Sequence, residues 1–92
     1  MERKLAIIGG GNLGSAMAEG LLSSGFVQAS RLVVTKRNTA SLQSLSERGV
    51  TVTSDNREAV QQADWIILAV KPFQVKEVVQ QILPVLDPAR QV

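Results

Sequence analysis

The sequence contains no cysteine, no histidine and no tyrosine, and its only aromatic residues are two phenylalanines and one tryptophan. Without cysteine the chain can form neither a disulfide framework nor a thiolate metal site. Without histidine it lacks the most common general base and the most common zinc ligand. No apolar run approaches the roughly 20 residues of a membrane-spanning helix. We therefore expect no bound metal, no membrane partner and a reducing, cytoplasmic environment.

An excess of charge of one sign is also missing. Ten Lys and Arg against eight Asp and Glu give a formal net charge of +2 at pH 7. Proteins that bind nucleic acid through its phosphates usually carry a strongly basic, asymmetric surface, so we do not expect nucleic acid as a partner. The chain has 92 residues, of which 45% are hydrophobic. This length and composition suit one small domain with an aliphatic core.

What the sequence does contain is a regular alternation of apolar runs and helical patterns. The runs at 5–8, 32–34, 50–52 and 65–70 predict strands, and each is followed by apolar residues at helical spacing. Four strand–helix units with short connections predict a Rossmann-type α/β fold. Right-handed crossovers then give a doubly wound parallel sheet with strand order 3-2-1-4. The run at 65–70 is nearly continuous, which predicts a strand covered on both faces.

The ends of the predicted helices carry residues that favour capping. The predicted caps are Gly25 after the first helix, Thr39 before the second, Asp55 or Asn56 before the third, and Pro72 in the first turn of the fourth. The fourth helix should bury Val75, Val78, Val79, Ile82 and Leu86, and Pro84 should weaken its last turn. Together these signals place all four helices between turns.

The last six residues, DPARQV, are typical of a turn that leads into a fifth strand. We therefore expect residues 1–92 to be a dinucleotide-binding domain truncated before its fifth strand, and thus a piece of a larger protein. The run WIILAV would then form an exposed apolar edge, through which such a piece could self-associate.

The most informative segment is GGGNLG, residues 9–14, directly after the first apolar run. Gly9, Gly11 and Gly14 match G-x-G-x-x-G between a strand and a helix. In this motif the first glycine permits a tight turn, the second lets a pyrophosphate approach the backbone, and the third lets the helix pack closely. The phosphates lie at the helix N-terminus. A glycine-rich turn without a ligand is the alternative, and the complete strand–turn–helix context argues against it.

The end of the second strand indicates which dinucleotide is bound. A site for NAD usually has an acidic residue about 20 positions beyond the glycines. The segment VVTKRN has none there, and offers Thr35, Lys36 and Arg37 instead. Arg and Lys suit a 2′-phosphate, so we predict NADP(H) as the cofactor, with NAD(H) as a second ligand left open. A solvated basic loop is the alternative.

The third and fourth strands should end at the same edge of the sheet, where ligands of this fold bind. This places Asn56 near the cofactor, together with the segment AVKP, which is Ala69, Val70, Lys71 and Pro72. On chemistry alone, Lys71 is equally well a phosphate or ribose contact or a surface lysine. Asn56 is more readily a helix cap than a ligand contact.

The stretches IGGGNLGSAMAEGLLSSG and SDNREAVQQADWIILAVKP, with the spacing between them, resemble the N-terminal domain of the pyrroline-5-carboxylate reductases over essentially the whole chain. The resemblance implies an NAD(P)H site and favours a role of Asn56 as a cofactor contact. Leu13 stands where the family often has Met. The implied cofactor-binding residues are Ile8, Gly9, Gly10, Gly11, Asn12, Leu13, Gly14, Thr35, Lys36, Arg37, Asn56, Ala69, Val70, Lys71 and Pro72.

The same resemblance implies hydride transfer from NAD(P)H to the C=N bond of 1-pyrroline-5-carboxylate, giving L-proline. In that family a C-terminal helical domain carries dimerisation and most of the substrate site. We therefore expect no catalytic residue in this chain, cofactor binding without turnover, and homo-oligomers formed through the absent domain. One alternative is the NADP-binding domain of a deazaflavin-dependent NADP reductase or a β-hydroxyacid dehydrogenase. Another is a non-catalytic nucleotide-binding regulatory module.

Overall fold

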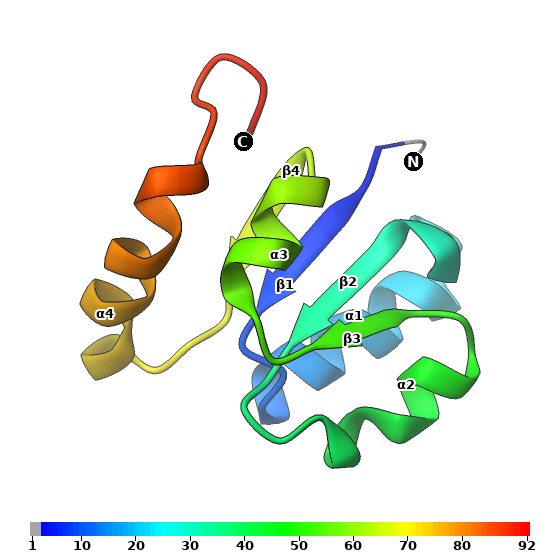
Figure 1. Cartoon of the computed structure of the whole chain (residues 1–92). Coiled ribbons are helices and arrows are strands. Elements are labelled where there is room, and N and C mark those ends of the chain that lie inside the picture. Colours follow the sequence, from blue (N-terminus) through cyan, green and yellow to red (C-terminus); the bar gives the residue numbers. More distant parts are fainter. Residues whose placement is uncertain (1–2) are drawn as a thin grey trace.

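The computed structural model describes residues 3–92 and contains one four-stranded sheet with helices on both faces (Figure 1). The strands are β1 (Leu5–Ile8), β2 (Leu32–Thr35), β3 (Thr51–Thr53) and β4 (Trp65–Leu68). Their order is β3-β2-β1-β4, and every neighbouring pair is parallel. The predicted fold class and strand order are therefore confirmed.

The helices occupy the crossovers between the strands. They are α1 (Asn12–Ser23), α2 (Gln43–Glu47), α3 (Asn56–Gln62) and α4 (Pro72–Ile82), with the short 3-10 turns η1 (Ala29–Arg31), η2 (Thr39–Leu42) and η3 (Leu83–Val85). The second predicted helix is thus divided into η2 and α2. Helices α1 and α2 cover one face of the sheet, whereas α3 covers the other and α4 lies beside it at the β4 edge, adding Val78 and Ile82 to the same core (Figure 1).

Strand β1 lies at the centre of the sheet and serves two cores, because successive side chains of a strand point to opposite faces. Leu5 and Ile7 pack with residues of α1, β2 and α2. Ala6 and Ile8 pack with residues of α3 and α4 on the other face. All four β1 side chains are buried, which explains why this run is continuously apolar.

The caps differ in part from the prediction. Gly25, with φ +74, follows α1 as expected. Asn38 rather than Thr39 caps η2, since its Oδ1 accepts the Ala40 N–H at 3.0 Å. Asp55 caps α3, since its Oδ1 accepts the N–H groups of Arg57 and Glu58, two and three residues further along the chain. The interpretation of Asn56 as a cap is therefore wrong, because Asn56 is already the first residue of α3.

Strand β4 is the edge of the sheet, and its exposed side chains contradict the expectation that both of its faces are covered. Trp65 and Leu68 are each 40% exposed. Helix α4 lies at this side of the sheet and buries a narrower face than predicted, with Val78 and Ile82 inside and Val75 exposed. Helix α4 packs mainly against α3, so its outermost apolar residues remain exposed to solvent.

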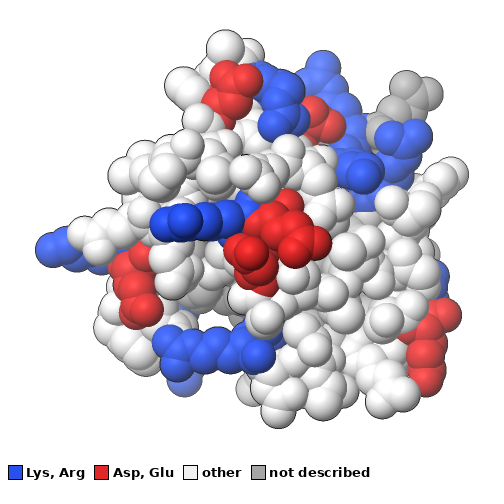
Figure 2. Space-filling view, in the orientation of Figure 1, with Lys and Arg blue, Asp and Glu red and all other residues white. Residues whose placement is uncertain are grey.

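The surface drawn in Figure 2 carries Lys and Arg interspersed with Asp and Glu, without a face of one sign. This mixture agrees with the small net charge of +2. A surface of this kind gives no broad electrostatic attraction for a polyanion. On the face drawn, an anion site must therefore come from a few neighbouring groups.

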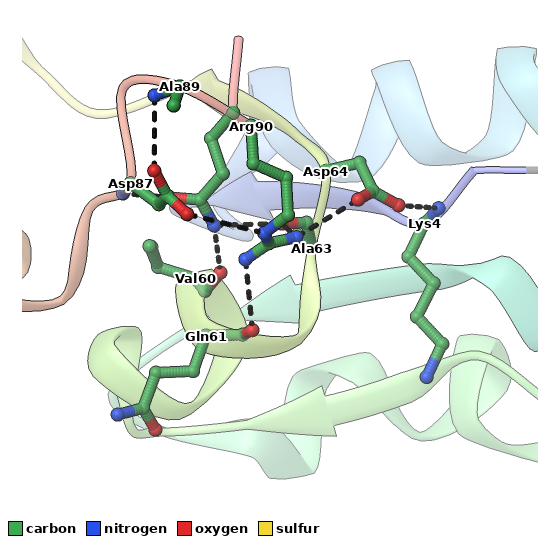
Figure 3. Close-up of polar contacts among 9 residues, drawn as sticks. Lys4, Val60, Gln61, Ala63, Asp64, Asp87, Ala89 and Arg90 are labelled. Carbon is green, nitrogen blue, oxygen red and sulfur yellow. Dashed lines mark hydrogen bonds and ion pairs between the residues drawn. The ribbon is translucent and has the colours of Figure 1, made fainter.

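Residues 87–92 turn back onto the junction between α3 and β4 (Figure 3). The outer edge of β4 is partly occupied, since the Ile66 N–H donates to the Val92 carbonyl at 2.7 Å and the Val92 N–H donates to the Asp64 carbonyl at 3.0 Å. The carbonyls at the end of α3, which lack helical partners, accept from the Arg90 guanidinium and the Gln91 amide. The predicted turn is present, and it anchors this segment.

Asp64 stands at the centre of the same junction. One carboxylate oxygen accepts the Lys4 N–H at 3.2 Å, and the other accepts from Arg90 Nη1 at 2.9 Å. The Lys4 N–H, followed by the Arg90 guanidinium, holds the pKa of the Asp64 carboxyl below its ordinary value. The charged form of Asp64 therefore ties together the start of β1, the start of β4 and the C-terminal segment.

Candidate functional site

The carboxyl ends of the four strands open onto a cleft of about 660 Å³. This volume lies within the range of small-molecule sites. Every predicted cofactor-binding residue except Gly14 lines the cleft. The lining residues are Ile8, Gly9, Gly10, Gly11, Asn12, Leu13, Thr35, Lys36, Arg37, Ser54, Asn56, Ala69, Val70, Lys71, Pro72, Gln74, Glu77, Val78 and Gln81.

Two glycines of the loop are required by the folded chain itself. Gly9 has φ +105, and a Cβ there would stand 2.8 Å from the carbonyl oxygen of Ala69. Gly14 is buried in α1, and a Cβ there would overlap the carbonyl oxygen of Gly9. The absence of Gly14 from the lining follows from this position beneath the loop, where it lets α1 approach closely.

The rest of the loop is held from below by β2. Gly10 is buried against Leu42 and Val34. Thr35 is 1% exposed, and its Oγ1 accepts the Gly9 N–H at 3.2 Å. Its carbonyl oxygen accepts the N–H groups of Gly9 and Gly10. The Thr35 hydroxyl therefore supports the loop, because the register of β1 and β2 sets Thr35 beside Ile8.

The exposed part of the loop can hold a phosphate or pyrophosphate. Gly11 is the residue before α1, and a Cβ there would meet nothing within 4 Å. Asn12 and Leu13 follow it and are exposed. The first N–H groups of a helix have no partner within it, and α1 has neither a side-chain cap nor an acid in its first turn. The positive end of α1 thus faces a space open to an anion.

Three cations lie around this loop. Lys36 and Arg37 follow β2, and Lys71 precedes α4. Within residues 3–92 none of the three forms an ion pair with a carboxylate. The backbone positions of two are fixed, since the Lys36 N–H donates to Thr53 and the Lys71 N–H donates to Gln74 Oε1 at 3.2 Å. Because no carboxylate among the described residues pairs with Lys36, Arg37 or Lys71, the charges of all three are available to a ligand, on either side of the glycine loop.

One wall of the cleft was missed by the sequence analysis. Gln74, Glu77, Val78 and Gln81 lie on one face of α4 and line the cleft together with Ser54. The spacing of three to four residues along α4 is the only sequence signal for this wall. The polar residues of a solvent-exposed helix face show the same spacing. A second hollow of about 360 Å³ adjoins this wall.

The side chains and backbone groups of the cleft suit the binding of a polar or charged small molecule. These groups are backbone N–H donors, amides, two hydroxyls, cations and one carboxylate. Across the described residues 3–92, no group of three His, Cys, Asp or Glu is placed to hold a metal ion. No helix in that range is both long and apolar enough to cross a membrane.

Comparisons with known proteins identify the family of this chain. The family model described as "NADP oxidoreductase coenzyme F420-dependent" matches residues 4–92. Pyrroline-5-carboxylate reductase 2 of Dictyostelium discoideum is 37% identical over 82 residues, which are 88% of this chain and 27% of that protein. This relative supports the resemblance inferred from the sequence.

Solved structures of the same kind share the fold. A pyrroline-5-carboxylate reductase from Coxiella burnetii superposes with a TM-score of 0.85 at 34% identity, covering 96% of this chain and 33% of that one. A Plasmodium falciparum pyrroline carboxylate reductase with NADP bound gives 0.78 at 27% identity, covering 92% and 30%. The chain therefore spans about a third or less of the length of these proteins.

Proposed function

Because this chain belongs to the family described as NADP oxidoreductase, coenzyme F420-dependent, we propose that it is the NADP(H)-binding domain of a pyrroline-5-carboxylate reductase. The observation that carries the proposal is the exposed start of α1, where Gly11 leaves open space in a cleft shared with Lys36 and Arg37. The relatives named pyrroline-5-carboxylate reductase support it, as does the related structure with NADP bound.

In this proposal each part of the cleft holds one part of the dinucleotide. The N–H groups that follow Gly11 hold the pyrophosphate, because an anion is stabilised at a helix N-terminus. Lys36 and Arg37 hold the 2′-phosphate, which an arginine can bind through two hydrogen bonds. The segment of Ala69, Val70, Lys71 and Pro72 lies on the nicotinamide side. Thr35 acts indirectly by holding the loop.

The bound cofactor supplies a hydride, and this chain supplies its position. We propose that the whole protein transfers this hydride to the C=N bond of 1-pyrroline-5-carboxylate, with a proton added to nitrogen, giving L-proline. The substrate-binding residues and the homo-oligomer contacts then belong to a part of the protein other than this domain. The domain alone should bind the cofactor without turnover.

The test is an assay of the protein that carries this domain. It should consume NADPH when 1-pyrroline-5-carboxylate is added and form an equal amount of L-proline, whereas the 92-residue domain alone should consume none. The family description favours one second candidate, an NADP reductase that uses coenzyme F420. Reduction of NADP by the reduced deazaflavin, with no proline formed, would contradict our proposal and support that candidate.

A further inference from the structure

Asn56, at the start of α3, is held in place by a residue from the far end of α4. Its Nδ2 donates to Oε1 of Gln81 at 2.9 Å. The main-chain carbonyl of Gln81 also accepts from Nε of Arg57 at 2.9 Å. Two neighbouring residues of α3 are therefore bound to one residue of α4, which lies 24 or 25 positions further along the chain.

The backbone contact follows from how α4 ends. The last carbonyls of a helix have no helical partner, and α4 ends at Ile82, directly before the 3-10 turn that contains Pro84. An arginine side chain is a suitable donor at such an end. Arg57 thus fixes the main chain of Gln81, and Gln81 in turn fixes the amide of Asn56.

The Asn56–Gln81 pair stands between two hollows. Both residues line the main cleft of about 660 Å³, and both line the adjoining hollow of about 360 Å³. The pair also lies close to the basic residues, because Asn56 follows β3 by three residues and the Lys36 N–H donates to Thr53 at the end of β3. It therefore lines the cleft near Lys36 and Arg37.

We propose that Gln81 is a positioning residue for the dinucleotide. By accepting from Nδ2, it leaves Oδ1 of Asn56 as an acceptor for a hydroxyl of the adenosine ribose. This inference rests on the proposed function, since it assumes that a dinucleotide occupies the cleft. It adds a residue of α4 that acts through Asn56 and need not touch the ligand itself.

Gln81→Met tests the inference, since methionine has a similar length and its thioether is only a weak acceptor. A neutral hydrogen bond of this kind corresponds to roughly a threefold to tenfold change in affinity. We expect the dissociation constants of NADPH and NADH to rise by the same factor, because the 2′-phosphate is not involved. Gln81→Glu keeps the acceptor and should therefore retain more affinity than Gln81→Met. This comparison uses NADH, which lacks the 2′-phosphate that a carboxylate would repel. Gln80→Met, the same change at the preceding, exposed position, should alter neither constant.

A double-mutant cycle separates positioning from a merely structural role. In the Asn56→Ala background, Gln81→Met should cause no further loss of affinity, because the amide that it orients is absent. The same fold-loss in both backgrounds, or an unchanged affinity of Gln81→Met with only lower stability in urea, would overturn the inference while leaving the proposed function intact. If the unmodified chain binds neither dinucleotide, the proposed function fails, and this inference fails with it.

Discussion

Replacing Gly11 with valine should abolish most dinucleotide binding while leaving the fold nearly unchanged. The backbone at Gly11 has φ −72 and ψ −160, which any residue can adopt, and an added Cβ would meet nothing within 4 Å. The remaining cost is that valine is a poorer residue than glycine before a helix. We therefore expect the free energy of unfolding to fall by about 1 kcal/mol or less.

The effect on affinity should be much larger. The branched side chain would occupy the space through which a pyrophosphate reaches the N–H groups at the start of α1. A hydrogen bond to a charged group contributes about 1.5–3 kcal/mol, so the loss of one such bond raises the dissociation constant roughly 10- to 150-fold. NADPH and NADH should be affected equally, because both carry the pyrophosphate.

Gly20→Ala in the same helix is the matched control. A Cβ at Gly20 also meets nothing within 4 Å, and alanine is favoured over glycine inside a helix by about 1 kcal/mol. This variant should be more stable and bind as the unmodified chain does. Calorimetric titration and urea denaturation of the three proteins give both quantities. If Gly11→Val binds NADPH normally, the start of α1 is not the phosphate site, and the reasoning is refuted.

Two further changes test other parts of the structure. Arg37→Asp should lower NADPH affinity about tenfold or more and favour NADH, because it removes a partner of the 2′-phosphate and supplies an acceptor for the ribose 2′-hydroxyl of NADH. An unchanged ratio of the two dissociation constants in paired titrations would contradict this. Because folding lowers the pKa of Asp64, its charged carboxylate stabilises the fold at pH values above the ordinary aspartate pKa of about 3.9. This stabilisation is lost as the pH falls through the lowered pKa. Asp64→Asn should therefore have a lower free energy of unfolding in urea near pH 7, and its difference from the unmodified chain should shrink below about pH 4. A difference that does not change with pH would contradict a stabilising role of the Asp64 charge.

Local patterns were enough to predict the sheet and the loop. The strand order follows from four alternating units, and GGGNLG required only its place between a strand and a helix. The caps were less certain, because a cap depends on the backbone angles of one particular residue. Asp55 is extended, with φ −100 and ψ 106, whereas its neighbour Asn56 is helical.

Contacts between distant elements could not be predicted in this way. The hydroxyl of Thr35 supports Gly9 because β1 and β2 pair in one register, which no local pattern specifies. Gln74, Glu77 and Gln81 resemble a solvent-exposed face of a helix until the connection through β4 brings α4 beside α3 (Figure 1). The wall of the cleft is thus a property of the packed fold.

The most direct test of this account is a calorimetric titration of the 92-residue chain with NADPH and, separately, with NADH. We predict saturable binding of NADPH at one site per chain, tighter than binding of NADH, because the glycine loop and the Lys36–Arg37 pair open onto one cleft. Binding of neither dinucleotide, or tighter binding of NADH, would contradict the assignment of this cleft to NADP(H).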